Sequence, residues 1–299
     1  MLDARAFASA AKRRPSPIRA AAWKATDALF SWLPAMILIA PLTLLGIGAF
    51  SESWDSRGPR GFTVEPFAAA WTFARQSAVF SLWIAALTAS ITAALAVPAA
   101  YLLSLDDRLA NRLLSPALAL PLVVPSLLLA MGLILAFPFW QGTWELLLLA
   151  YVTQCLPFAI WPVATALTMI DMGTLETAGR TLGAKQSQRF LWLVLPNVAR
   201  PAAVGATTVF ILVLAESSSS FFLASGHYQP FGVTLYNAFQ DLDIRVAAAT
   251  TMLLVAMLAP AILALEFWLA APQGSARDTD RRQDAARSND PFQQEPRRV

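Results

Sequence analysis

Long apolar stretches alternate with short polar segments along most of the chain. Six of the stretches reach the roughly 20 mostly apolar residues that a helix needs to cross a bilayer. They lie at residues 29–50, 78–104, 114–137, 145–170, 202–224 and 246–271. The sequence lacks the ten-residue segments of alternating hydrophobicity that are typical of membrane β-barrels. The pattern therefore predicts an all-α membrane protein with six transmembrane helices.

The basic residues predict which ends of these helices face the cytoplasm. Of the 22 Lys and Arg residues, 18 lie in the N-terminal segment, the second and fourth connections and the C-terminal tail, and four lie in the other connections. Because cytoplasmic segments carry an excess of Lys and Arg, we expect both termini in the cytoplasm. We divide the chain into a basic cytoplasmic segment at 1–27, a six-span domain at 28–271 and a disordered cytoplasmic tail at 272–299.

Composition narrows the possible chemistry. Charged residues make up 14% of the chain, against about 25% in soluble domains. One Cys and one His, His227, exclude a disulfide framework and the common Cys or His metal sites. An intramembrane zinc protease needs two His, and no Gly-x-Ser-x-Gly elbow accompanies the serines. We expect no catalytic residue, no metal site and no nucleic-acid partner. Two other classes of membrane protein stay open as alternatives: a secondary transporter and, less favoured, an intramembrane enzyme.

Prolines and one acidic residue stand out inside the predicted spans. Pro121 and Pro125 form the densest proline cluster, in the third span, where each removes a helical hydrogen bond. Glu216 begins a run of polar residues that we place well inside the fifth span, and an ionisable group in a membrane indicates function. We expect a translocation pathway or a subunit interface to include Glu216, Ser217, Ser218, Pro121 and Pro125. Internal packing is the alternative for this polar run.

The connection between the fourth and fifth spans, residues 171–200, has a helical pattern of its own. Thr174 is placed to cap a helix over 175–182, and Gly183 to end it in a left-handed conformation. A second helix is predicted over 186–195, ending at Pro196. A short amphipathic helix in the cytosol either lies on the membrane surface or docks into a groove of another protein.

The spacing of residues in this connection resembles a known motif. Residues 177–183 read Thr-Ala-Gly-Arg-Thr-Leu-Gly, and nine residues later the chain reads Leu-Val-Leu-Pro. This is similar to the EAA loop of bacterial binding-protein-dependent ABC importer permeases: Glu-Ala-Ala, three residues, Gly, nine residues, Ile, one residue, Leu-Pro. Thr177 stands at the place of the motif Glu, directly after Glu176, and Gly179 replaces the second Ala.

Two further segments extend the resemblance over the membrane region. Residues 120–125, Leu-Pro-Leu-Val-Val-Pro, resemble the proline-rich third span of this family. Residues 62–67 resemble the segment before the second span in the branch that imports polyamines, iron(III) and thiamine.

The resemblance implies a function and a set of partners. The chain would be the permease subunit of an ATP-driven importer in the bacterial inner membrane, forming half of the substrate pathway. Its partners would be a cytoplasmic ABC ATPase dimer, a second permease subunit (the same or a paralogue) and a periplasmic substrate-binding protein. The chain would bind no cofactor, since ATP and Mg would be used by the ATPase. The residues implied in ATPase coupling are Glu176, Thr177, Ala178, Gly179, Gly183, Leu193, Leu195 and Pro196. The substrate stays open.

Overall fold

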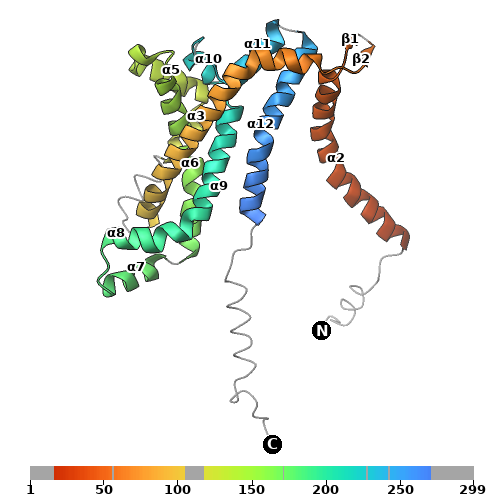
Figure 1. The fold of residues 1–299 in the computed structure, drawn as a ribbon. Coiled ribbons are helices and arrows are strands. Elements are labelled where there is room, and N and C mark those ends of the chain that lie inside the picture. Colours follow the sequence, from red (N-terminus) through yellow and green to blue (C-terminus); the bar gives the residue numbers. More distant parts are fainter. Residues whose placement is uncertain are drawn as a thin grey trace, which may run out of the picture. The chain divides into compact units, whose positions relative to one another are not determined.

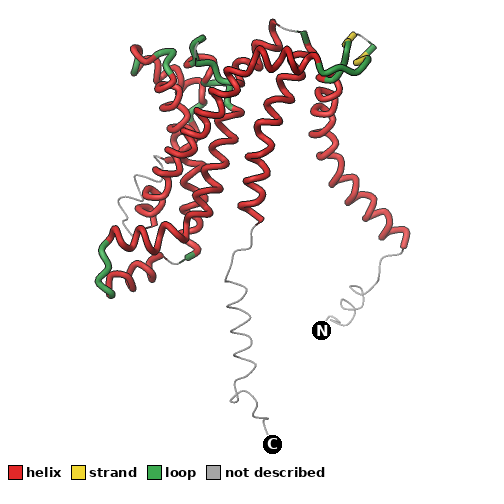
Figure 2. Tube along the Cα trace, viewed as in Figure 1, coloured by secondary structure: helices red, strands yellow, loops and turns green. Residues whose placement is uncertain are grey.

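A computed structural model describes residues 17–55, 57–104, 118–170, 172–226, 228–241 and 243–270. These residues are almost entirely helical (Figure 2). They divide into two compact units: unit 1 holds the described parts of 1–76 and 234–255, and unit 2 those of 77–233 and 256–299. Helix α3 (Glu65–Ser104) and helix α12 (Ile244–Ala270) each contribute residues to both units.

Six helices carry most of the apolar sequence (Figure 1): α2 (Pro17–Ala49), α3 (Glu65–Ser104), α5 (Ser126–Ala136), α6 (Trp144–Met169), α9 (Leu195–Ala215) and α12 (Ile244–Ala270). Shorter elements connect them: β1 (Ser53–Asp55), β2 (Gly58–Arg60), the 3-10 turn η1 (Pro138–Trp140), α7 (Met172–Thr181), α8 (Gln186–Arg189), the π turn η2 (Phe190–Val194), α10 (Ser220–Leu223) and α11 (Phe231–Asp241). Among the described residues, five helices are long and apolar enough to cross a membrane, and α5 is a shorter apolar helix. The all-helical membrane fold is confirmed.

The third predicted span, 114–137, is a broken helix. Residues 118–123 are helical, the chain leaves the helix at Val124 and Pro125, and α5 begins at Ser126. Pro125 is extended, and its carbonyl accepts hydrogen bonds from the amides of Leu128 and Leu129. At about 1.5 Å per residue, α5 is about 16 Å long, roughly half of a bilayer core. The third span is therefore interrupted at the proline cluster that the sequence singled out.

Other boundaries differ from the predictions as well. Helix α2 begins at Pro17, so residues 17–27 are helical although the sequence placed them before the first span. Helix α9 ends at Ala215, nine residues before the predicted end of the fifth span. His227, the first 16 residues and the tail at 272–299 lie outside the described residues. The cytoplasmic location of the termini stays a prediction.

Unit 1 is held by small residues and a short hairpin. Ala49 of α2, Ala70 of α3 and Ala248 of α12 are fully buried against one another, which lets the helix backbones come close. β1 and β2 pair antiparallel. The ring of Trp54 occupies the space beside Gly48, where a Cβ would lie 1.9 Å from a ring carbon.

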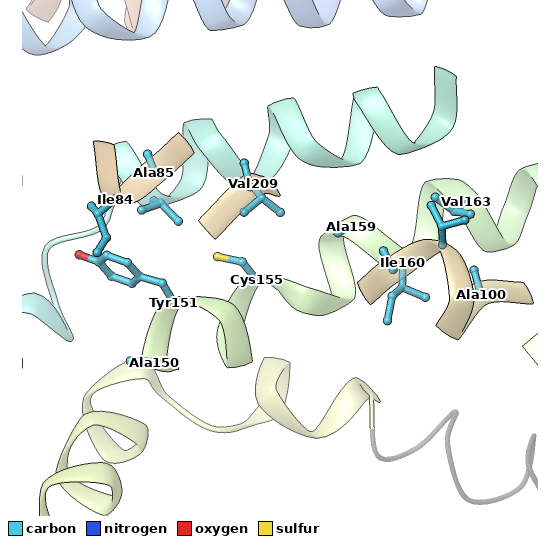
Figure 3. Packing of buried hydrophobic residues seen from close by; sticks show 14 of the residues in the cluster. Ile84, Ala85, Ala100, Ala150, Tyr151, Cys155, Ala159, Ile160, Val163 and Val209 are labelled. Carbon is cyan, nitrogen blue, oxygen red and sulfur yellow. The ribbon is translucent and has the colours of Figure 1, made fainter. Parts of the chain in front are cut away.

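Unit 2 is built on the close pair α6 and α9. A Cβ at Gly205 would lie 2.9 Å from the carbonyl oxygen of Ala159, so the two backbones touch at this glycine. Figure 3 shows Tyr151, Cys155 and Ile160 along α6, packed with residues of α3 and α9. This rigid pair carries α7 and α8 at one end and leads to α5 and α10 at the other (Figure 1).

Candidate functional site

Helix α7 lies at one end of unit 2, in the connection whose spacing resembles the EAA loop (Figure 1). It begins at Met172, so Thr174 lies inside the helix and the predicted cap at Thr174 is wrong. Gly183 follows the helix with a φ of 76°. The Gly183 amide donates to the carbonyl of Arg180 (2.9 Å), and the Ala184 amide to that of Gly179 (3.0 Å). This Schellman-type pattern confirms the predicted left-handed end.

The second helix of the connection does not stop at Pro196. The α8, η2 and α9 segments form one continuous apolar helix from Gln186 to Ala215. The Leu195 amide donates to Phe190, five residues back, which is the bond of a π turn. Pro196 follows directly after this π turn, inside the continuous helix, where it offers no amide to the preceding turn. The helix therefore continues through the proline.

The inward face of α7 carries a buried ionic cluster. Glu176 is 6% exposed and Arg189 of α8 is 8% exposed. Oε1 of Glu176 accepts hydrogen bonds from Nε of Arg189 (2.9 Å) and Nε of Arg180 (3.3 Å). Oε2 accepts from the hydroxyl of Tyr101 (3.1 Å), on α3. Arg189 also donates to the carbonyl of Ala184. One carboxylate thus joins α3, α7 and α8.

The outward face of α7 is exposed, and the turn that follows the helix presents a large apolar side chain. Thr177, Ala178 and Thr181 are exposed, and Leu182 is 86% exposed. A groove of about 510 Å³ lies between α7 and the α8–η2 segment, and the buried Gly179 and Arg189 also line it. Its walls include Leu175, Ala178 and Leu182 on one side and Gln188, Trp192 and Leu193 on the other.

The residues implied in coupling therefore fall into two groups. Thr177, Ala178, Gly183, Leu195 and Pro196 are exposed, whereas Glu176 and Gly179 are buried and Leu193 is half-buried. Thr177 satisfies its own hydroxyl by donating to the carbonyl of Gly173 (2.8 Å). Sequence reasoning missed Tyr101 and Arg189. Arg189 could have been suspected, because it is a basic residue in the same connection as the acidic Glu176. Nothing in the sequence indicates the Tyr101 contact, because it joins residues 75 positions apart.

Glu216 lies at the other end of α9, where it is the C-cap residue. Its carboxylate accepts hydrogen bonds from the amide and hydroxyl of Ser219 (3.0 and 2.9 Å) and from the hydroxyl of Ser220 (2.9 Å). Ser220 is also within 2.6 Å of the Tyr151 hydroxyl. The placement of Glu216 well inside the fifth helix is therefore wrong, because the helix ends at Ala215 and the Glu216 carboxylate takes the amide of Ser219 that a continuing helix would have bonded to a backbone carbonyl.

The other residues expected at a pathway occupy different positions. Ser217 is half-buried and Ser218 is exposed. Pro121 lies in the helical piece before the break in the third span, and Pro125 is exposed directly before α5. Among the described residues, no group of three or more His, Cys, Asp or Glu lies together as a metal site would require. A pathway role for these residues stays a prediction.

Comparison with known proteins gives a consistent result. The family model of the binding-protein-dependent transport system inner membrane component matches residues 94–272. The chain is 26% identical over 254 residues to the putative 2-aminoethylphosphonate transport system permease protein PhnV of Salmonella typhimurium, covering 83% of this chain and 94% of PhnV. It is 26% identical over 231 residues to the spermidine/putrescine transport system permease protein PotC of Escherichia coli, covering 73% of this chain and 84% of PotC.

A longer relative and a solved structure agree with this. The probable ABC transporter permease protein y4fN of Sinorhizobium fredii is 26% identical over 244 residues, covering 77% of this chain, which spans 42% of that protein. A chain of the MetNI methionine ABC transporter in an inward-facing conformation has the same fold, with a TM-score of 0.56 and 18% identity, covering 69% of this chain and 99% of that one. The chain therefore belongs to the family of binding-protein-dependent transport system inner membrane components, and it is a multi-pass transmembrane subunit of an ABC importer.

Proposed function

We propose that α7 is the segment through which a cytoplasmic ATPase drives this permease. The chain would form half of the translocation pathway, and a second permease subunit, the same or a paralogue, would form the other half. A periplasmic binding protein would deliver the solute, and ATP with Mg would bind to the ATPase. The connection that holds α7 would lie on the cytoplasmic side of the bacterial inner membrane.

The observation that carries this proposal is the two-faced character of α7. One face of the helix is fixed by a buried carboxylate, and Leu182, directly after the helix, is 86% exposed beside a groove lined mainly by apolar side chains. Trp192, across the groove, is 78% exposed. Burying such side chains in a partner is favourable, and a short amphipathic helix commonly docks in this way.

A pair of matched leucines tests the proposal. Leu182 and Leu135, in α5 at the far end of unit 2, are 86% and 83% exposed. The permease is co-expressed with a candidate ABC ATPase, and the amount of ATPase that copurifies is measured. We expect Leu182→Ser to lower copurification about tenfold or more, because a buried Leu contributes about 1.5–3 kcal/mol. Leu135→Ser should leave it unchanged. Equal copurification with both variants would contradict a docking role for α7.

The names of the relatives suggest which solutes to try first. PhnV and PotC are named for 2-aminoethylphosphonate and for spermidine and putrescine, all of which carry a primary amino group. We propose amine-bearing solutes as the substrate class. The test is calorimetric titration, with these three solutes, of a periplasmic binding protein that copurifies with this permease. Binding of at least one supports the class, and binding of none removes it.

A further inference from the structure

We propose that Glu176 is a positioning residue that makes α7 move together with α3 and α8, and that Gly179 serves to admit the Arg189 side chain that neutralises it. This inference rests on the proposed coupling role of α7, because a segment pushed by an ATPase needs a stiff link to the spanning helices. Three observations support it: the contacts of the carboxylate, the space at Gly179 and the difference between two arginines.

The carboxylate of Glu176 bridges three elements through its two oxygens. Oε1 is bonded to Arg189 on α8, and Oε2 to Tyr101 on α3. Tyr101 is 3% exposed, and its ring packs on Phe190 with a centroid distance of 5.6 Å. Moving α7 away from α3 would leave a buried carboxylate short of partners, which is strongly unfavourable. The cluster therefore resists relative motion of α7.

Gly179 is matched to Arg189. A Cβ at this glycine would lie 2.8 Å from Cδ and 3.2 Å from Cγ of Arg189. Alanine, which the EAA pattern has at this place, would therefore press on the stem of the arginine. Gly179 is in regular α7 helix, where glycine is unfavourable compared with alanine. The space for Arg189 is thus a reason for a glycine here.

The two arginines at Glu176 provide a matched control. Both donate an Nε hydrogen bond to the same oxygen, Oε1. The side chain of Arg189 is 10% exposed, whereas that of Arg180 is 64% exposed. Solvent weakens an exposed ion pair, so the buried arginine should carry the link.

Spin labels on α3 and α7 test the link in the complex of the permease with its ATPase. Labels are placed at Leu95→Cys and Gly173→Cys, both exposed and outside the residues proposed to meet the ATPase, in a Cys155→Ala background. The distance distribution is recorded without nucleotide and after trapping with MgATP and vanadate. We expect a narrow distribution in both states for the otherwise unchanged chain. Glu176→Gln and Arg189→Ala should widen it at least about twofold, whereas Arg180→Ala should not.

Two further variants separate positioning from simple misfolding. Tyr101→Phe removes a single hydroxyl and should also widen the α3–α7 distribution. Gly179→Ala should widen it in the original chain but add nothing in the Arg189→Ala background, where the clash is gone. An unchanged distribution in Glu176→Gln and Arg189→Ala would overturn the inference.

The proposed function and this inference can fail separately. Copurification of the ATPase with the unchanged permease tests the first. If no ATPase binds, the proposed function fails, and the same label pair in the permease alone still shows whether Glu176 fixes α7. If the ATPase binds to the Glu176→Gln variant and the distances stay narrow, the inference alone is wrong.

Discussion

The carboxylates of Glu176 and Glu216, near opposite ends of α9 in unit 2, obtain their hydrogen-bond donors in different ways. Glu176, on α7, is bound by Arg189 and by the distant Tyr101. Glu216, at the end of α9, is bound by two serines three and four residues further along the chain. The Glu176 carboxylate forms an ion pair with an arginine of another helix. The Glu216 carboxylate accepts hydrogen bonds from uncharged groups of nearby serines. The first carboxylate bonds directly to a distant helix, whereas the second reaches α6 only through Ser220, which lies within 2.6 Å of the Tyr151 hydroxyl.

This contrast predicts the largest effect at Arg189. Arg189→Ala leaves a buried carboxylate without its closest cation and should lower the free energy of unfolding by about 3–5 kcal/mol. Arg180→Ala, at the exposed pair on the same oxygen, should lower it by about 1 kcal/mol or less. Denaturant unfolding of the detergent-solubilised permease measures both. Equal losses would mean that burial does not distinguish the two arginines.

The local cap should be less costly to remove. Glu216→Ala leaves the amide of Ser219 and two hydroxyls without their acceptor, which should cost about 1–3 kcal/mol. Glu216→Gln keeps one acceptor and should cost less. The same unfolding assay decides, and solute uptake by the variants shows whether Glu216 also serves the pathway. A loss for Glu216→Ala as large as that for Arg189→Ala would remove the distinction between cap and link.

A smaller effect is expected at Gly183, where only the backbone conformation matters. No atom lies within 4 Å of a Cβ built at this residue. Gly183→Ala should therefore cost only the left-handed strain of about 1–2 kcal/mol. Gly183→Asn should cost less, since Asn tolerates this conformation better than Ala. If both variants unfold at the denaturant concentration of the unchanged chain, the helix end is not under this constraint.

The smallest effect is expected at an exposed pair in unit 1. Asp243, 45% exposed, accepts hydrogen bonds from the Arg245 side chain and amide, which hold the pKa of its carboxyl below the usual value. The stability that this pair adds to the folded state is fully present above the unfolded-state pKa of about 4. It is lost as the pH falls through the lower folded-state pKa. Salt should weaken this pair but not Glu176–Arg189. Unfolding of Arg245→Ala and Arg189→Ala at low and high salt measures the difference, and equal salt dependence would contradict it.

The sequence predicted the features that depend on local pattern. Apolar length located five membrane-spanning helices, and Gly183 marked the end of α7 because only glycine adopts that conformation easily. The proline cluster marked where the third span is interrupted, since proline has no amide to donate. The early end of α9 was missed, because nothing in the apolar pattern shows that the Glu216 carboxylate takes the amide of Ser219. The Glu176 cluster depends on Tyr101, and nothing local indicates a contact 75 residues away.

The central claim is that α7 meets the ATPase with its exposed face, and site-specific photo-crosslinking tests it most directly. A photoreactive phenylalanine analogue replaces Leu182, or Leu135 as the control, in cells that express the permease with the ATPase used for copurification. The account predicts a crosslink to the ATPase from position 182 and none from position 135. A crosslink from position 135 alone, or from neither position while the ATPase still copurifies, would contradict the account.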